Sequence, residues 1–505
     1  MKLARRLLAT ALLLTVLTRL VFVLLPRVPL ETKAVTSVGD AREYIALALN
    51  LASSHTFSRD TVRPFRPELF RTPGYPLFLT VPLLLVRHSS FALHPSSFIL
   101  LSLLLQLLLS IVTLWLTYRL ALELALGPVT SAFAALLVGL SPNLAFLSSK
   151  LISEALFIPL LLACMLLLNR YRLAGRALDL IGTGICSGLL ILTRPIATFF
   201  PFLLAAYILF RVLRSSFFVP GSSFRLHPSS FIPPLILLAC ASVVVAPWVI
   251  RNGRKTGRYI VSTASEHNIY LYDAATVLAS ERSITIPQAR DLMMTEAQSK
   301  FGRIDTTDEA SMWQKLAAVA RSHFFRRPAL AAPVWLFGVF ANFLNPISVG
   351  PLLIHSGSSP AAGSTNLLQS SIALLAKGRV TQAFGTAWRV RVGGAPLFIL
   401  VVLACAALFN LILIWFGLAS LFLRRTRGLF WLLLPILYFT MVTGTVGDAR
   451  FRAPIEPLLC LFAAVALIRR PRPTAVRRYD PPSGGTPDQD YSSCSIGLAT
   501  RGASR

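Results

Sequence analysis

Long apolar stretches recur along this chain, and most are close to the length that a helix needs to cross a lipid bilayer. A span requires roughly 20 mostly apolar residues to cover about 30 Å of hydrocarbon, and by that rule we predict about ten spans. They are residues 7–25, 98–120, 128–147, 152–168, 178–193, 196–213, 231–250, 396–423, 428–446 and 453–468. Two further apolar stretches, residues 75–86 and 329–343, are expected at the interface or only partly inserted. The fold class predicted is therefore an all-α polytopic membrane protein.

The composition supports this prediction and indicates which kinds of partner the chain binds. Hydrophobic residues make up 55% of the chain and charged residues only 14%, which leaves too little polar surface to cover a soluble globule. The formal net charge is +28. Its basic residues lie mostly in short clusters beside apolar stretches, so we interpret them as topology signals and contacts with anionic lipid or phosphate, not with nucleic acid.

Arginine clusters fix the expected orientation, because cytoplasmic loops carry an excess of Lys and Arg. With the N-terminus inside, the clusters at 170–176, 211–225, 424–427 and 469–472 all fall in the cytoplasm. Two long segments, 26–97 and 251–395, and short turns near Lys150, Arg194 and 447–452 then lie outside. We expect residues 1–468 to form the membrane domain and residues 469–505, rich in Pro, Gly, Ser and Asp, to be a disordered cytoplasmic tail.

Two motifs in the first outer segment have the residue types for chemistry. They are G-D-A-R-E-Y at residues 39–44 and R-T-P-G-Y-P at residues 71–76. An acid just outside a span, followed by a basic residue at a Pro-Gly turn, is suited to hold an acceptor hydroxyl and a lipid phosphate at one interface. A solvated acid and a snorkelling arginine are the alternative that spacing alone leaves open.

Further motifs follow in order along the chain, and together with the first two they resemble a known family. They are S-P-N-L-A-F-L-S-S-K-L-I-S-E-A-L at 141–156, G-L-L-I-L-T-R-P at 188–195, A-P-W-V-I-R-N at 246–252 and G-D-A-R-F-R-A-P-I-E-P-L-L at 447–459. The set resembles the bacterial branch of the GT-C glycosyltransferases, which groups protein O-mannosyltransferase-like enzymes, the lipid A aminoarabinose transferase and the RgtA/B/C/D-like lipopolysaccharide transferases. The resemblance implies juxtamembrane helices in the first outer loop and a cavity open toward the outer leaflet.

The resemblance also implies an activity. A sugar passes from a polyprenyl-phosphate carrier to a protein, lipid or glycan acceptor, with inversion, at the outer face of the cytoplasmic (inner) membrane, and Asp40 is the catalytic base. The second catalytic acid falls on Glu154, where relatives often carry Asp, so positioning is an alternative role. A third possible role for Glu154 is structural: a negative charge at a helix N-terminus is stabilised by the helix dipole. No cofactor is implied, and Asp40 lacks the D-x-D partner that would indicate a metal.

The departing phosphate needs cations close by. Arg71 is the first candidate, and we assign Tyr44, Glu43, Lys150, Arg194, Arg251, Arg450 and Arg452 to the same substrate and phosphate site. The four last arginines end spans on the outer side, where cations are disfavoured, so each requires a partner. Asp448 and Glu456 are expected to neutralise Arg452, which lies one helical turn before Glu456.

Three alternatives compete with this function. A transporter or flippase of lipid-linked sugars also has many spans, but its inverted repeats with broken helices are not evident here. An O-antigen ligase or polymerase also uses polyprenyl carriers, but its principal outer loop lies between late spans, whereas the acidic motif here follows the first. The third alternative is a degenerate, non-catalytic scaffold subunit, against which the presence of Asp40, Arg71 and Glu154 together speaks weakly.

Overall fold

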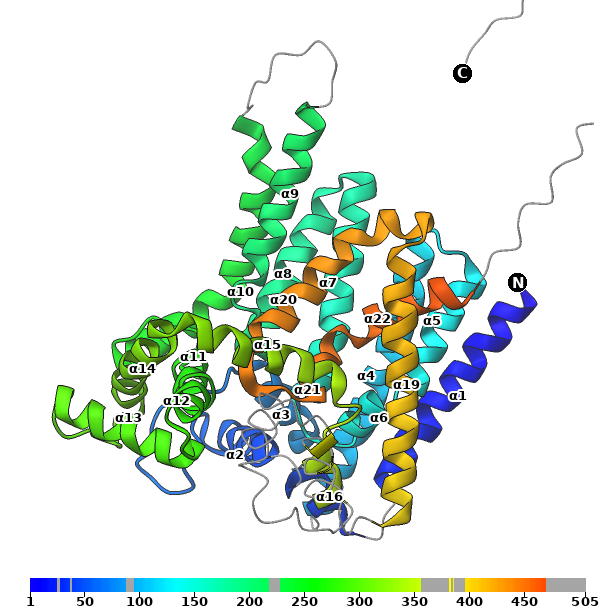
Figure 1. Cartoon of the computed structure of the whole chain (residues 1–505). Helices are drawn as coiled ribbons and strands as arrows, with labels where there is room; N and C mark the ends of the chain where they lie inside the picture. Colours follow the sequence, from blue (N-terminus) through cyan, green and yellow to red (C-terminus); the bar gives the residue numbers. More distant parts are fainter. Residues whose placement is uncertain are drawn as a thin grey trace, which may run out of the picture. The chain divides into compact units, whose positions relative to one another are not determined.

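The structure, a computed structural model, describes residues 1–24, 28–36, 39–87, 95–217, 228–355, 381–382, 385 and 396–468. Over these residues the chain forms helices joined by turns and short 3₁₀ or π segments, with no strand (Figure 1). The helices are α1 Lys2–Leu24, α2 Gly39–Ser54, α3 Gly74–Arg87, α4 Pro95–Glu123, α5 Pro128–Leu140, α6 Pro142–Ser148, α7 Glu154–Ala174, α8 Ala177–Thr193, α9 Phe200–Phe217, α10 Ile232–Thr256, α11 Ala264–Asn268, α12 Ala275–Arg282, α13 Ile286–Phe301, α14 Glu309–Arg326, α15 Pro328–Leu344, α16 Val349–His355, α19 Leu397–Leu421, α20 Leu433–Val442, α21 Ala449–Arg452 and α22 Glu456–Leu467. Residues Met1–Ile468 form one compact unit, and the expected tail, 469–505, lies outside the described residues.

Six of the described helices, α1, α4, α7, α9, α10 and α19, are long and apolar enough to cross a membrane. The number rises to eight if the bent pairs α5–α6 and α14–α15 each make one span. Shorter apolar helices cover α3, α8 and residues 426–442. The all-α, multi-span fold class predicted from the apolar stretches is thereby confirmed.

The long helices pack side by side around a shared apolar core. Helix α5 contacts α1, α4 and α22, while α7 contacts α4 and α8, and α10 contacts α8 and α9. Phe157, Cys164 and Phe462, on α7 and α22, are fully or almost fully buried in that core. Leu13, Phe202 and Trp415, on the peripheral helices α1, α9 and α19, are largely exposed. An apolar exterior of this kind is suited to contact with lipid tails.

Three of the expected spans are broken, and the first break has a clear cause. The helix expected over 128–147 bends by 55° between α5 and α6. Pro142 has no backbone N–H to continue α5, and the Ser141 hydroxyl accepts from the backbone N–H of Leu144 at 3.1 Å, which caps the new helix α6. The expected spans 428–446 and 453–468 likewise begin with 3₁₀ turns, at Arg424–Leu432 and Ala453–Ile455, so the helices that follow are shorter than predicted.

Residues 264–326 form a small helical cluster of their own within the second predicted outer segment. Leu316, Val319 and Ala320 on one face of α14 are buried against α13 and the π-helical turn Ile269–Ala274. The apolar face of α14 therefore packs inside the protein. The cluster ends at Arg326, where α14 meets α15 at an angle of 102°.

Candidate functional site

The first turn of α2 presents two carboxylates beside a buried tyrosine. Asp40 and Glu43 are three residues apart and so share a face of the helix, with Tyr44 next to them. The Tyr44 ring is buried, and its hydroxyl donates to the Ser153 hydroxyl at 3.2 Å, just before α7. This contact fixes the start of α2 against the start of α7.

Arg71 closes over these carboxylates from the turn before α3. Its Nη2 lies 2.6 Å from Asp40 Oδ1 and its Nε 2.6 Å from Glu43 Oε2, while its guanidinium lies 5.2 Å from the centre of the Tyr44 ring. The turn can sit here because Gly74 approaches the end of α8 closely. A Cβ at Gly74 would meet the carbonyl oxygen of Leu192 at 2.7 Å, so a larger residue would push Arg71 away.

Arg450 joins this group from the far end of the sequence. Its Nη2 lies 2.7 Å from Asp40 Oδ2, and its Nε and Nη2 both donate to the carboxylate of Glu154. Glu154 is the first residue of α7 and its side chain is only 1% exposed. Arg194, at the C-terminal end of α8, pairs with the same carboxylate.

These contacts form an alternating chain of three carboxylates and three guanidiniums, which we call the ion chain. Its order is Glu43, Arg71, Asp40, Arg450, Glu154, Arg194. The formal charges cancel, so an extended ionic cluster is tolerated beside the apolar helices. Asp40 lies in the middle and has a guanidinium on each carboxylate oxygen.

Asp40 is held in its ionised form. Burial would raise its pKa, but Arg450 and Arg71 outweigh burial and hold the pKa well below its ordinary value. The pKa of Arg450 shifts in the complementary direction: burial would lower it, and the charges of Asp40 and Glu154 raise it. An ionised carboxylate that two guanidiniums bind becomes a good proton acceptor only when those guanidiniums bind another anion.

The loop that carries Arg450 is fastened on three sides. The Asp448 carboxylate accepts from the backbone N–H of Arg450 at 2.8 Å and also binds the Ser348 hydroxyl. Asn345 donates to the carbonyl of Gly447 at 2.9 Å. Gly338 of α15 lies so close that a Cβ there would meet Thr445 Cα at 2.6 Å.

The ion chain contains seven of the ten residues predicted for the site, if Tyr44 is counted by its ring contact with Arg71. Lys150 and Arg251 are bound elsewhere. The Lys150 ammonium donates to the carbonyl of Lys33 at 2.6 Å. The Arg251 guanidinium donates to the carbonyls of Glu68 and Phe57, and these contacts pin the first outer segment to α10.

Arg452 is the third residue outside the ion chain. It is 2% exposed and donates to the carbonyl of Asn342 in the last turn of α15 and to those of Asn345 and Pro346 just after it. Its Nε also lies 3.4 Å from Glu456 Oε2, which confirms the expected pairing of these two residues. Asp448, the other acid expected to neutralise Arg452, instead binds the backbone N–H of Arg450 and the Ser348 hydroxyl. The contacts of Arg452 hold helices together, and the prediction that it binds phosphate remains a prediction.

Sequence reasoning missed Arg59, which extends the network. Its guanidinium pairs with Glu43 at 3.1 Å, with Glu309 at 2.9 Å and with the buried Glu68. Glu309 is 250 residues away at the start of α14. No motif surrounds Arg59, and its partners come from two outer segments, so only the tertiary structure identifies it.

The acidic groups do not converge as metal ligands do. Within the described ranges, no three His, Cys, Asp or Glu side chains are grouped closely enough to hold a metal ion. Asp40 and Glu154 are instead separated by the guanidinium of Arg450.

Comparison with known proteins gives structural neighbours alone. No family model and no curated protein matches the chain. Among solved structures it is similar to the oligosaccharyltransferase of Archaeoglobus fulgidus in the apo form, with 15% identity and a TM-score of 0.48. It is also similar to the same archaeon's oligosaccharyltransferase AglB in complex with an inhibitory peptide and a dolichol-phosphate, with 14% identity and a TM-score of 0.46. In both cases the match covers 92% of this chain and 50% of the other, so the chain spans about half the length of these neighbours.

Proposed function

We propose that this membrane protein is a GT-C-type glycosyltransferase. It takes a sugar from a polyprenyl-phosphate carrier and transfers it, with inversion, to a hydroxyl of a protein, lipid or glycan acceptor at the outer face of the cytoplasmic membrane. The observation that carries the proposal is the position of Asp40, whose two carboxylate oxygens are each bound by an arginine, Arg71 at 2.6 Å and Arg450 at 2.7 Å. A base and two phosphate-binding cations thus share one place beside the membrane helices.

In the proposed reaction, the acceptor oxygen attacks the anomeric carbon of the sugar. The bond between that carbon and the phosphate oxygen breaks, and its electron pair leaves with the polyprenyl phosphate. The acceptor proton passes to Asp40. The phosphate gains one negative charge as Asp40 loses one, so Arg71 and Arg450 face the same total charge before and after transfer.

Donor binding also prepares the base. A phosphate that draws Arg71 and Arg450 toward itself weakens their hold on Asp40. The pKa of Asp40, low while both guanidiniums bind it, then rises toward its ordinary value, and the carboxylate becomes a better proton acceptor when donor is present.

Glu154 is assigned a positioning role. Its side chain is only 1% exposed, whereas that of Asp40 is 24% exposed, so Asp40 is the acid that an acceptor hydroxyl can reach. Glu154 holds Arg450 in place for Asp40 and the phosphate. This assignment takes up the positioning role that the Glu-for-Asp difference from relatives suggested.

The test is transfer by the purified full chain, reconstituted in liposomes with a panel of radiolabelled polyprenyl-phosphate sugars and membrane acceptors. Asp40→Asn keeps the shape of the side chain and removes its basicity. We expect a loss of transfer of about 10²-fold or more, the usual contribution of a general base. Asp291→Asn, the same change on an exposed turn of α13, is the matched control. The proposal fails if the wild type transfers no sugar, and Asp40 is not the base if Asp40→Asn transfers at the wild-type rate.

A further inference from the structure

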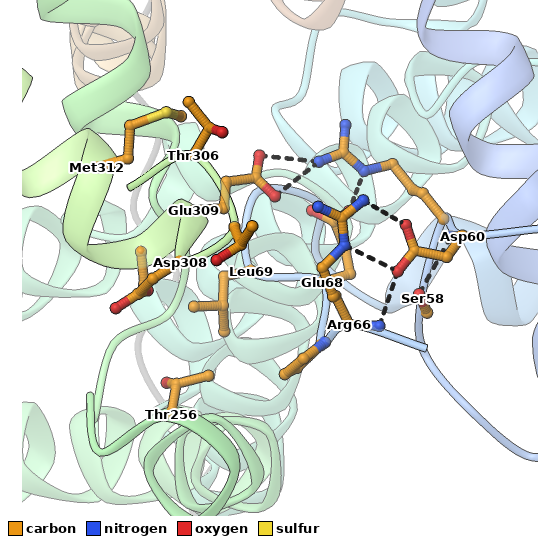
Figure 2. A pocket seen from close by; sticks show the side chains of 14 residues that line it. Ser58, Asp60, Arg66, Glu68, Leu69, Thr256, Thr306, Asp308, Glu309 and Met312 are labelled. Carbon is orange, nitrogen blue, oxygen red and sulfur yellow. Dashed lines mark hydrogen bonds and ion pairs between the residues drawn. The ribbon is translucent and has the colours of Figure 1, made fainter. Parts of the chain in front are cut away.

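A cleft of about 490 Å³ opens where the two predicted outer segments meet. One wall comes from the first segment, with Ser58, Asp60 and Glu68, and the other from the second, with Thr306 and Glu309 at the start of α14 (Figure 2). Its volume falls within the range of pockets that bind small molecules, about 300–1,000 Å³. Pro67, Leu69, Ala310 and Met312 add apolar surface to the lining.

Arg59 connects this cleft to the ion chain. It lines the cleft and binds Glu309 at 2.9 Å on one side, and on the other it binds Glu43 at 3.1 Å. Glu43 in turn binds Arg71, which binds Asp40. Arg59, Glu43 and Arg71 therefore stand in succession between the cleft and Asp40.

The lining of the cleft is acidic in a strongly basic protein. It has four carboxylates, Asp60, Glu68, Asp308 and Glu309, and two guanidiniums, Arg59 and Arg66. Burial raises the pKa of Glu68, but carboxylates outnumber guanidiniums even without it. An anionic group that entered this cleft would meet a repulsive field.

The hydrogen-bonding groups of the cleft suit an uncharged, hydroxyl-rich ligand. Glu309 and Asp60 present carboxylate oxygens as acceptors and remain partly exposed, with side chains 38% and 20% accessible. Thr306 and Thr307 contribute exposed hydroxyl positions at the rim. Carboxylates and guanidiniums placed beside small apolar patches match the alternating hydroxyl and C–H faces of a sugar.

We propose that this cleft is the acceptor subsite and that it takes an uncharged glycan, whose end reaches past Arg59 to Asp40. The inference rests on the proposed function, since it names the acceptor class of the same site. It predicts that the chain prefers a neutral glycan acceptor to an anionic lipid headgroup or a peptide.

The test compares three acceptors in the reconstituted system: a neutral glycolipid without phosphate, a phosphorylated lipopolysaccharide core and a serine- and threonine-containing peptide. The variant is Thr306→Trp, which places a large ring in the cleft at an exposed position. The matched control is Thr295→Trp, at an exposed position of α13 away from the cleft lining. We expect the neutral glycan to be the preferred acceptor and Thr306→Trp to raise its KM about tenfold or more, which corresponds to a loss of roughly 1.4 kcal/mol of binding. The KM of Thr306→Trp for the donor should equal that of the wild type.

A second measurement does not depend on the variant. Hydrogen–deuterium exchange of the wild-type chain with the neutral acceptor should show protection at residues 58–69 and 306–312. Transfer only to the anionic core or the peptide overturns the acceptor class. Transfer to the neutral glycan with an unchanged KM in Thr306→Trp and no protection overturns the location. Absence of transfer to all three acceptors is the separate result that refutes the proposed function.

Discussion

Arg450 Nη2 lies 2.7 Å from Asp40 Oδ2, although 410 residues (450 minus 40) separate the two in sequence. The same guanidinium binds Glu154, so it joins the start of α2 to the start of α7. Much of the behaviour expected of the site follows from this one side chain.

Removal of Arg450 should destabilise the protein. Arg450→Ala leaves Asp40 and Glu154 with one guanidinium each in place of two. Loss of one partner of a buried ion pair costs about 3–5 kcal/mol. We expect a clearly lower unfolding midpoint in detergent, measured by nanoscale differential scanning fluorimetry. Arg424→Ala, at an exposed arginine, is the control and should change little. An unchanged midpoint in Arg450→Ala would show that the ion chain contributes nothing to stability.

Arg71→Lys should lower transfer more than it lowers stability. Arg71 binds Asp40 and Glu43 through two different nitrogens, and a lysine ammonium is a single compact charge that cannot reproduce this fork. We expect kcat/KM for the donor to fall about 10–100-fold, which corresponds to roughly 1.4–2.8 kcal/mol. Steady-state kinetics with a varied donor concentration measure this. If Arg71→Lys has the kinetics of the wild type, Arg71 does not bind the donor phosphate.

Gly338→Ala should displace the loop that carries Arg450. The added Cβ would lie 2.6 Å from Thr445 Cα, which is backbone and has no flexible end to move aside. Overpacking of this kind costs about 1–3 kcal/mol. Gly417→Ala, within α19, has nothing within 4 Å of the added Cβ and serves as the control; it should be neutral or slightly stabilising. Equal midpoints for the two variants would contradict this packing.

Stability should fall in acid through Asp40. Its pKa is lower in the folded than in the unfolded chain, so its contribution is fully present above its unfolded pKa of about 4 and is lost as pH falls toward the folded value. Unfolding midpoints between about pH 3 and pH 7 should therefore drop at the acidic end, and the drop should be smaller in Asp40→Asn. An identical pH dependence in both proteins would contradict the pairing of Asp40 with the two arginines.

The sequence predicted the helical membrane fold and the Asp40–Arg71 region because both depend on local patterns. Apolar length marks a span, and G-D-A-R-E-Y places Asp40 and Glu43 on one helix face in any environment. The break at Ser141 was not predicted. A hydropathy average over about 20 residues hides a single proline, and Pro142 breaks the helix here because Ser141 caps the next one.

Apart from the Arg452–Glu456 pair, the partners of the arginines were beyond the reach of sequence reasoning. Arg450 and Arg452 both lie in the turn before α22, two residues apart, and a count of charges at span ends treats them alike. In the structure Arg450 binds two carboxylates, whereas Arg452 binds Glu456 and backbone carbonyls at the end of α15. Which partner each finds depends on helices that are remote in sequence, and the same holds for Arg59.

The order in which the ion chain is encoded also governs when it can form during synthesis. Asp40 and Arg71 are made first, then Glu154 and Arg194, and both pairs can meet while the later helices are still on the ribosome. Arg450 links the two pairs, and it lies only 18 residues (468 minus 450) before the end of the compact unit. The two pairs therefore stay unlinked until Arg450 has been made. A chain that stops before α21 has all six of the long apolar helices described above and no joined site.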